Sequence, residues 1–188
     1  MKHRSAEQLQ AAVTKILESP FDGGHVELIV RRPEVGEREL LTSAELSIEL
    51  GLVGDNWHSR GSFKTADGLA HPGMQLTLMS SRVISALAGP KERWPLAGDQ
   101  LFVDLNLSAE NLSPGTRLKV GTAVVEVSAV PHTGCKKFVA RFGSAAAKFV
   151  GSEMGRRLNF RGINAVVVEP GEVKVAERLW KIPGLTTP

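Results

Sequence analysis

Cys135 is the one cysteine in the chain, and its neighbours determine what its sulfur could do. The segment from Val130 to Phe138 has a turn containing Pro131 and Gly134 before the cysteine, and two lysines and a predicted helix start after it. Backbone N–H groups at a helix start and nearby cations favour an ionised sulfur. A thiolate can bind a soft metal, carry sulfur or attack an electrophile. The alternative is a buried cysteine that packs as a small apolar side chain.

Basic side chains gather in the sequence around Cys135. The window from residue 132 to residue 161 contains seven basic groups and one acid, Glu153, so its net charge is +6, against +3 for the whole chain. Those basic groups are Lys136, Lys137, Arg141, Lys148, Arg156, Arg157 and Arg161. This excess predicts an anionic ligand, and the alternative is a solvated helical face. His132, three residues before Cys135, is a candidate proton acceptor, so the two form a candidate catalytic pair.

Two further segments carry polar residues next to glycines. Asp55 follows Gly54 in a predicted tight turn, where its carboxylate is expected to accept backbone N–H bonds and lock the turn. Asp99 and Gln100 precede a predicted strand, where they could hydrogen-bond a ligand or merely begin the strand. The chain contains no glycine-rich nucleotide loop and no nucleophile elbow.

The composition limits the class of protein. The 188 residues are 42% hydrophobic and 23% charged, which is typical of a soluble globular domain. No apolar stretch is long enough for a membrane span, and the N-terminus does not look like a secretory signal. A single cysteine cannot form an internal disulfide, so we expect a cytoplasmic protein with no membrane partner. Few aromatic residues and no recognised motif argue against a nucleic-acid partner.

The pattern of apolar residues and turns predicts a strand-rich domain. An amphipathic helix is expected over residues 5–18, with Ser5 as N-cap and Gln8 as its capping-box partner. Further helices are predicted over residues 43–50 and 81–88 and in short pieces after 135. Single strands are predicted over residues 25–32, 39–42, 74–79 and 101–105. Two hairpins are predicted as well, one of 117–120 with 123–130 and one of 163–169 with 172–176.

Strands and helices do not alternate along the chain, which favours a β-barrel or a mixed sheet with a few peripheral helices. We expect a helical extension over residues 1–24 and one barrel domain over residues 25–188. Within it, residues 54–73 are predicted to form a long polar loop, which is often functional at such a length. Residues 182–188 are predicted to be a loosely ordered tail.

Taken in order, these pieces resemble the MOSC domain, named for the C-terminal domain of molybdenum cofactor sulfurases, in its stand-alone bacterial type. The resemblance covers roughly residues 25 to 176 and rests on the ordered set more than on any one piece. The pieces are Gly51-Leu52-Val53-Gly54-Asp55, Gln75-Leu76-Thr77-Leu78-Met79, Gly98-Asp99-Gln100-Leu101, Pro114 to Gly121, the Cys135 segment, Arg161-Gly162-Ile163-Asn164-Ala165 and the turn at Pro170-Gly171.

The resemblance implies a barrel similar to that of pyruvate kinase and a molybdenum cofactor of the molybdopterin type. It implies Cys135 as the molybdenum ligand. The candidate cofactor-binding residues are Asp55, Asp99, Gln100, Thr133, Lys136, Lys137, Arg141 and Arg161. Where the family often has Gly-Glu-Asn-Leu, this chain has Gly98-Asp99-Gln100-Leu101, which keeps the chemical type but changes side-chain length. No pyridoxal phosphate is expected, because the chain lacks the aminotransferase-like sulfurase domain.

Three functions remain open from the sequence. The first is an oxidoreductase that reduces small N-hydroxylated compounds with electrons from a donor protein. The second is a sulfur carrier that receives sulfur from a cysteine desulfurase as a persulfide on Cys135. The third is a non-catalytic module that binds an anion or a partner. The sequence leaves a homodimer open.

Overall fold

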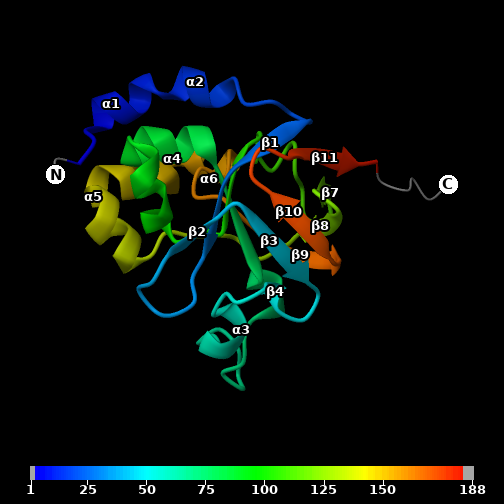
Figure 1. The fold of residues 1–188 in the computed structure, drawn as a ribbon. Coiled ribbons are helices and arrows are strands. Elements are labelled where there is room, and N and C mark those ends of the chain that lie inside the picture. The colour runs from blue at the N-terminus through cyan, green and yellow to red at the C-terminus, as the bar shows by residue number, and fades with distance from the viewer. Residues whose placement is uncertain (1–2, 184–188) are drawn as a thin grey trace.

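The structure is a computed structural model and describes residues 3–183 (Figure 1). Its helices are α1 (Ala6–Ala11), α2 (Val13–Leu17), α3 (Trp57–Arg60), α4 (Ser81–Ala88), α5 (Lys136–Gly151) and α6 (Glu153–Arg157), with 3-10 turns η1 (Pro72–Met74) and η2 (Lys91–Ala97). Its strands are β1 (Gly24–Arg31), β2 (Glu39–Leu41), β3 (Ser43–Ser47), β4 (Gly51–Leu52), β5 (Leu76–Ser80), β6 (Leu101–Asp104), β7 (Arg117–Val120), β8 (Ala123–Val127), β9 (Ile163–Glu169), β10 (Gly171–Lys174) and β11 (Arg178–Ile182).

Seven strands close into a barrel in the order β11-β7-β8-β9-β5-β6-β1, and β1 returns to pair with β11. The closing register pairs Gly24 with Leu179 and His25 with Arg178. The pairing of β5 with β6 is parallel, which requires the crossover that α4 and η2 provide. β2 extends the sheet beyond β1, and β10, β3 and β4 form a small second sheet. The predicted β-barrel with peripheral helices is confirmed.

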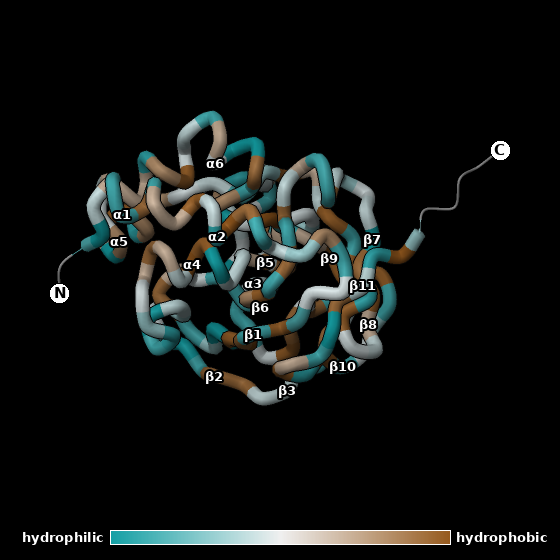
Figure 2. Tube along the Cα trace, turned by 90° about the horizontal axis from the view of Figure 1, so that it is seen from above, coloured by the Kyte–Doolittle hydropathy of each residue, from teal (hydrophilic) through white to brown (hydrophobic). Residues whose placement is uncertain are grey.

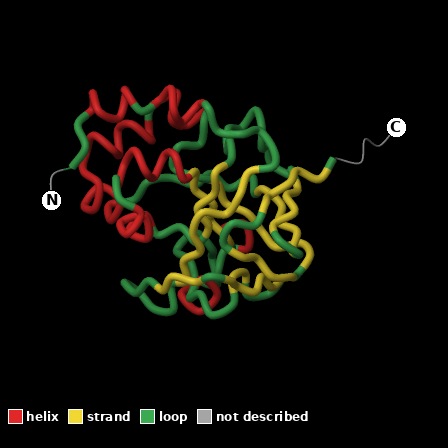
Figure 3. Tube along the Cα trace, turned by 45° about the horizontal axis from the view of Figure 1, so that its top comes forward, coloured by secondary structure: helices red, strands yellow, loops and turns green. Residues whose placement is uncertain are grey.

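Strands that carry helices on their outer side are buried on both faces. In β6, Leu101 and Val103 face the barrel core, and Phe102 faces a second core shared with the helices. In β7, whose main contacts are with β8 and β11, Arg117 and Lys119 are exposed on the outer face. Figure 2 shows polar and apolar stretches following one another along the chain, and Figure 3 shows most of the helices gathered on one side of the strands.

The helical layer has its own apolar core. Leu9 of α1 and Ile16 of α2 pack into the same buried cluster as Phe138 and Phe142 of α5, whose ring centroids are 5.0 Å apart. The predicted capping box is confirmed at the start of α1 because the Ser5 amide donates to the Gln8 side chain (3.0 Å) and the Gln8 amide donates to Ser5 Oγ (3.3 Å). The helix that leads to the candidate site is therefore packed against the N-terminal helices.

The predicted helix over residues 43–50 is wrong, since this segment begins with strand β3. Ala44 and Leu46 alternate into the barrel core, and the strand pairs with β10. The predicted hairpin of 163–169 with 172–176 is also wrong. β9 pairs with β5 and β8, and the chain turns after Glu169 so that β10 joins β3 instead. Both errors concern pairings between segments far apart in the sequence.

Two predicted irregular segments contain regular structure. The loop over residues 54–73 includes α3 and the start of η1. The predicted tail begins at Ile182, which is the last residue of β11, the strand that closes the barrel. Residues 184–188 of that tail lie outside the described residues.

Glycine is required where β9 begins. Gly162 has a φ of +97°, and a Cβ there would overlap the carbonyl oxygen of Leu78 on β5. Gly115 has a similar φ of +87° with nothing within 4 Å of its would-be Cβ. We predict that Gly162→Ala lowers the free energy of unfolding by about 2 kcal/mol more than Gly115→Ala, because only the first adds overlap to backbone strain. Urea unfolding of both variants measures this, and equal losses would contradict it.

Candidate functional site

A basic cavity of about 340 Å³ lies where several loops meet beside the first turns of α5. Its walls come from the β1–β2 loop, α3 and the loop after it, the end of η2, the segment before α5, and Arg161. In Figure 1 this is the side of the barrel between α5 and α3. Among the described residues, its lining contains seven cationic side chains and one carboxylate, Glu34. The cations are Arg32, Arg38, Arg60, Lys64, Lys137, Arg141 and Arg161.

Cys135 is exposed and lies on the wall of this cavity. It is the N-cap residue of α5, with extended backbone angles (φ −118°, ψ 171°) and a carbonyl that accepts from Phe138 N at 2.9 Å and Val139 N at 3.2 Å. Its side chain makes no capping hydrogen bond. The helix start predicted after Cys135 is confirmed, and the alternative of a buried apolar cysteine is excluded.

The cations of the cavity repel one another. Burial lowers the pKa of Arg38, and the charges of Arg141 and Arg32 lower it further. Burial likewise lowers the pKa of Arg60, with Arg32 again contributing. Arginine stays charged at any physiological pH, so this repulsion persists until an anion enters. The cavity therefore suits an anionic ligand.

Asp55 anchors one wall of the cavity. Its carboxylate accepts from the Arg32 backbone N–H (3.0 Å), from Arg32 Nε (2.8 Å) and from Arg32 Nη2 (2.7 Å). It also accepts from the Trp57 backbone N–H at 2.9 Å, so it locks the turn after Gly54 as predicted. Arg32 Nη1 donates to the Gly98 carbonyl at 2.9 Å and thereby ties the β1–β2 loop to the end of η2.

Asp99 anchors the opposite wall through Arg161. Both oxygens of its fully buried carboxylate accept from Arg161 Nη1, at 3.0 and 2.8 Å. Arg161 Nη2 donates to the Ala97 carbonyl at 3.1 Å, and its guanidinium lies over the Phe138 ring, 5.0 Å from the centroid. Arg161 is therefore fixed between the barrel and α5, and part of its side chain lines the cavity.

Gln100, which follows Asp99 in the chain, has a side chain that bonds strand β5 and approaches Asp55. Its Oε1 accepts from Thr77 N (2.8 Å) and Thr77 Oγ1 (2.6 Å). Its Nε2 donates to the Gln75 carbonyl at 3.2 Å and approaches Asp55 Oδ1 at 3.4 Å. The side chain is fully buried, so its hydrogen-bonding capacity is used inside the protein.

His132 lies on the cavity wall next to this network. Its Nδ1 is 3.4 Å from Asp99 Oδ1, and that nitrogen is buried with no hydrogen-bond partner among the described residues. Burial and then the Arg161 charge lower the pKa of His132 to about 3, against the opposing effect of Asp99. The imidazole is thus neutral at neutral pH, and its contact with Asp99 is not an ion pair. A base this weak accepts a proton poorly.

The predicted site residues fall into two groups. Those that line the cavity are Cys135, His132, Thr133, Lys137, Arg141 and Arg161. Asp55, Asp99 and Gln100 lie beneath its walls with buried side chains, and Lys136 is exposed and outside the lining. In this structure these four have no surface in the cavity with which to contact a ligand.

Sequence reasoning missed all four lining cations that the first half of the chain contributes. The cavity lining includes Arg32 and Arg38 of the β1–β2 loop, Arg60 at the end of α3 and Lys64 after it, and no motif joins them. The one available signal was the length and polarity of the loop over residues 54–73, which contributes Arg60 and Lys64.

Within residues 3–183, no group of three or more His, Cys, Asp and Glu side chains could hold a metal ion.

Several solved structures resemble this one. The YuaD protein of Bacillus subtilis matches with a TM-score of 0.62 at 15% identity over 83% of this chain and 93% of that chain. YiiM from Escherichia coli matches with a TM-score of 0.55 at 20% identity, over 86% and 71%. YiiM from Geobacillus stearothermophilus matches with a TM-score of 0.54 at 13% identity, over 88% and 76%. No family model and no curated protein matches the sequence.

YuaD and YiiM are MOSC-domain proteins, and at these identities the likeness concerns the fold. The chain therefore has a MOSC-type β-barrel. None of the helices within residues 3–183 has the length and apolar character needed to cross a membrane.

Breaking the Asp99–Arg161 pair should cost stability because both groups are buried. We predict that Asp99→Asn lowers the free energy of unfolding by about 3 kcal/mol, since it leaves a buried guanidinium without its counter-ion. Glu126→Gln is the matched control because Glu126 pairs with Arg117 at 3.0 Å on the surface. That variant should lose less than about 1 kcal/mol. Urea unfolding compares the two, and similar losses would show that Arg161 finds compensation elsewhere.

His132 should make stability depend on pH. Its folded-state pKa of about 3 lies below the ordinary 6.5, so the unfolded chain takes up a proton that the folded protein refuses. The contribution of His132 to the free energy of unfolding is fully present above pH 6.5. It is lost as pH falls towards about 3, at up to about 1.4 kcal/mol per pH unit. Unfolding of wild type and His132→Gln from about pH 7 to about pH 5, above the carboxylate range, measures the difference. Parallel pH profiles would contradict the prediction.

Proposed function

We propose that this chain is a MOSC-family protein that binds a molybdenum cofactor and reduces small N-hydroxylated compounds, with Cys135 as the metal ligand. One observation carries the proposal: the exposed lone thiol lies on the wall of a cavity that contains seven cationic side chains. The MOSC-type barrel around that cavity agrees with it.

The residues present fit this cofactor chemically. A thiolate is a preferred donor for a soft metal, and Cys135 offers an accessible sulfur without a capping hydrogen bond to compete for it. The cofactor is an anionic pterin phosphate, and the cavity presents charges of the opposite sign. Its volume of about 340 Å³ lies in the range of small-molecule sites.

Each group of residues has a distinct role in this proposal. Cys135 would hold the metal, and the lining cations Arg38, Arg60, Lys137 and Arg141 would bind the phosphate. When bound, the cofactor supplies the two-electron chemistry of the reduction. The neutral imidazole of His132 would hydrogen-bond the substrate or a water at a ring nitrogen. Thr133 on the same wall offers a hydroxyl for the same purpose.

The buried residues act indirectly. Asp55, Asp99 and Gln100 hold Arg32, Arg161 and the strand ends in place, so they would position the cavity without contacting the ligand. Electrons would come from a donor protein, because the sequence carries no motif of its own for a flavin or an iron–sulfur cluster. In this proposal the protein works in the cytoplasm.

A sulfur carrier is the second candidate, and the exposed thiol at a helix N-terminus supports it. The Cys135 thiolate would attack the outer sulfur of a persulfide on the cysteine of a desulfurase. The S–S bond of that persulfide breaks, the desulfurase cysteine leaves as a thiolate, and Cys135 becomes the persulfide. The low pKa of His132 disfavours that imidazole as the base for this step. A non-catalytic anion-binding module is the third candidate.

Molybdenum content tests the first candidate. After expression in a host that makes the cofactor, we predict bound molybdenum and pterin in wild type and their loss in Cys135→Ala. Lys137→Gln should retain roughly a tenth of the wild-type cofactor affinity, because it removes one charged contact. Lys136→Gln is the matched control, since Lys136 neighbours it in sequence but does not line the cavity. Thermal unfolding confirms that each variant folds.

Equal molybdenum in wild type and Cys135→Ala would contradict the role of the thiol as ligand. A protein without metal or pterin, which gains about 32 Da from a desulfurase and loses that gain in Cys135→Ala, would favour the sulfur carrier instead.

A further inference from the structure

The two ring nitrogens of His132 have different surroundings. Nδ1 is buried, has no hydrogen-bond partner among the described residues, and lies 3.4 Å from Asp99 Oδ1. Nε2 makes no hydrogen bond within residues 3–183 either, but it keeps an accessible surface, and the residue lines the Cys135 cavity. The ring therefore has one nitrogen against a buried carboxylate and one that a ligand in the cavity can reach.

The neutral imidazole carries one proton, which is on either nitrogen. With the proton on Nε2, the lone pair of Nδ1 would face a carboxylate oxygen in a space without water, and the two would repel. With the proton on Nδ1, an N–H group faces that oxygen instead. The distance of 3.4 Å exceeds the roughly 2.7–3.2 Å of an ordinary N–H···O bond, so the attraction is that of a dipole for a nearby charge.

Asp99 has room for this second donor. Its carboxylate accepts from Arg161 Nη1 at 3.0 Å on Oδ1 and at 2.8 Å on Oδ2, and Arg161 is its one hydrogen-bond donor among the described side chains. A carboxylate has about four lone-pair sites, so Oδ1 keeps one for the ring of His132. The side chain of Asp99 is fully buried, so water does not compete for that site.

A rival arrangement involves Arg161 Nε, which is also buried and unpaired within the described part of the chain. If it donated to an unprotonated Nδ1, the proton of the ring would be on Nε2. The two Nη groups hold the guanidinium towards Asp99 and the Ala97 carbonyl, and the structure has no hydrogen bond from Nε to His132. Asp99 Oδ1 is the group in recorded contact with Nδ1.

We propose that Asp99 is a positioning residue that keeps the proton of His132 on Nδ1 and leaves Nε2 as a hydrogen-bond acceptor in the cavity. The seven cations of the lining offer donors only, so an uncharged acceptor complements them. In the proposed reaction, the hydroxyl of the N-hydroxylated substrate donates to Nε2. This contact rests on the proposed function, whereas the position of the proton does not.

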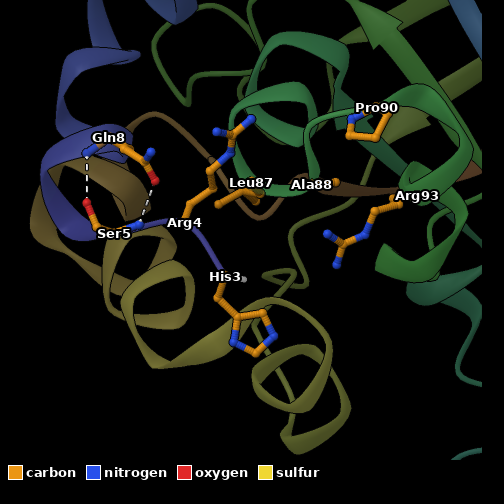
Figure 4. A pocket seen from close by; sticks show the side chains of 8 residues that line it. All are labelled: His3, Arg4, Ser5, Gln8, Leu87, Ala88, Pro90 and Arg93. Carbon is orange, nitrogen blue, oxygen red and sulfur yellow. Dashed lines mark hydrogen bonds between the residues drawn. The ribbon is translucent and has the colours of Figure 1, made fainter. Parts of the chain in front are cut away.

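A histidine on a cavity wall is not sufficient for this inference. His3 lines a second cavity beside Arg4, but Figure 4 shows its ring and the Arg4 guanidinium pointing away from each other. Among the described residues that cavity has no carboxylate in its lining. The contact with a buried carboxylate is what distinguishes His132.

NMR of the ¹⁵N-labelled full chain tests the proton position without cofactor or activity. At about pH 8, where an ordinary histidine is neutral, long-range ¹H–¹⁵N spectra report which ring nitrogen carries the proton. We predict a protonated Nδ1 and a bare Nε2 for His132, whose signals are assigned by their loss in His132→Gln. His71 is the internal control with the opposite tautomer, because its Nδ1 accepts from the Gly73 N–H at 3.1 Å. A proton on Nε2 of His132, or a mixture of tautomers, would overturn the inference.

Asp99→Asn should move the proton of His132 to Nε2. Arg161 would still donate to the amide oxygen, so the amide NH₂ would face Nδ1 and require a lone pair there. Asp104→Asn is the matched control, since it breaks the Asp104–Arg82 pair of 2.7 Å without touching His132, and the tautomer should stay. Thermal unfolding checks both variants, and the wild-type spectrum decides if Asp99→Asn does not fold. A folded Asp99→Asn with an unchanged tautomer would show that Asp99 does not hold the proton.

Acetohydroxamic acid and its O-methyl ether test the contact with the substrate. The acid should shift the Nε2 signal of His132 in a saturable way, and the ether, which lacks the hydroxyl proton, should bind about tenfold more weakly. An Nε2 signal that neither compound moves would overturn the contact. A protein with the expected tautomer but no molybdenum would contradict the proposed function and leave the role of Asp99 in place.

Discussion

Two buried carboxylates hold the cationic cavity together. Asp55 fixes Arg32 and Asp99 fixes Arg161, with contacts of 2.7 to 3.0 Å on side chains that are almost inaccessible to water. In each pair the guanidinium also bonds a backbone carbonyl near Asp99, at Gly98 for Arg32 and at Ala97 for Arg161. A buried pair of this kind is costly to break and contributes little net stability, so its value here lies in fixing the position of the loops. The barrel strands supply the rigid frame to which those loops are attached.

The charges above these pairs have a different character. Arg38 and Arg60 lie where burial and neighbouring cations work against their charge, and among the described residues the lining offers them only Glu34 in return. A folded protein tolerates unfavourably placed charges when they serve another interaction, and attraction to an anionic ligand is such an interaction. The thiol of Cys135 lies on the same wall, so an anion that also carries a soft metal or a transferable sulfur would meet both features at once.

Local signals in the sequence were sufficient for part of this structure. The capping box of Ser5 and Gln8, the turn locked by Asp55 and the helix that begins after Cys135 each depend on residues a few positions apart, and each was predicted. β3 was predicted as a helix, and β10 was predicted as a strand with the wrong partner. Their pairing joins segments about 130 positions apart, which no local pattern records. The same limitation applies to the site. Arg38 lies in the β1–β2 loop and Arg60 ends α3, and only the closed barrel brings them next to α5, whereas Lys137 and Arg141 could be found beside Cys135.

The kink in α5 connects the site to the N-terminal helices. At Gly143 the backbone takes a φ of +87°, so the helix changes direction between the turns that carry Lys137 and Arg141 and the turns whose Ala146 and Val150 pack into the core. A side chain at this position would meet both backbone strain and the His3 ring. The N-terminal segment thus docks where the chain can accommodate only a glycine. This residue separates the first turns of α5, which carry the cavity-lining Lys137 and Arg141, from its later turns. Any change in how that segment sits would act on the direction of the helix that presents Cys135.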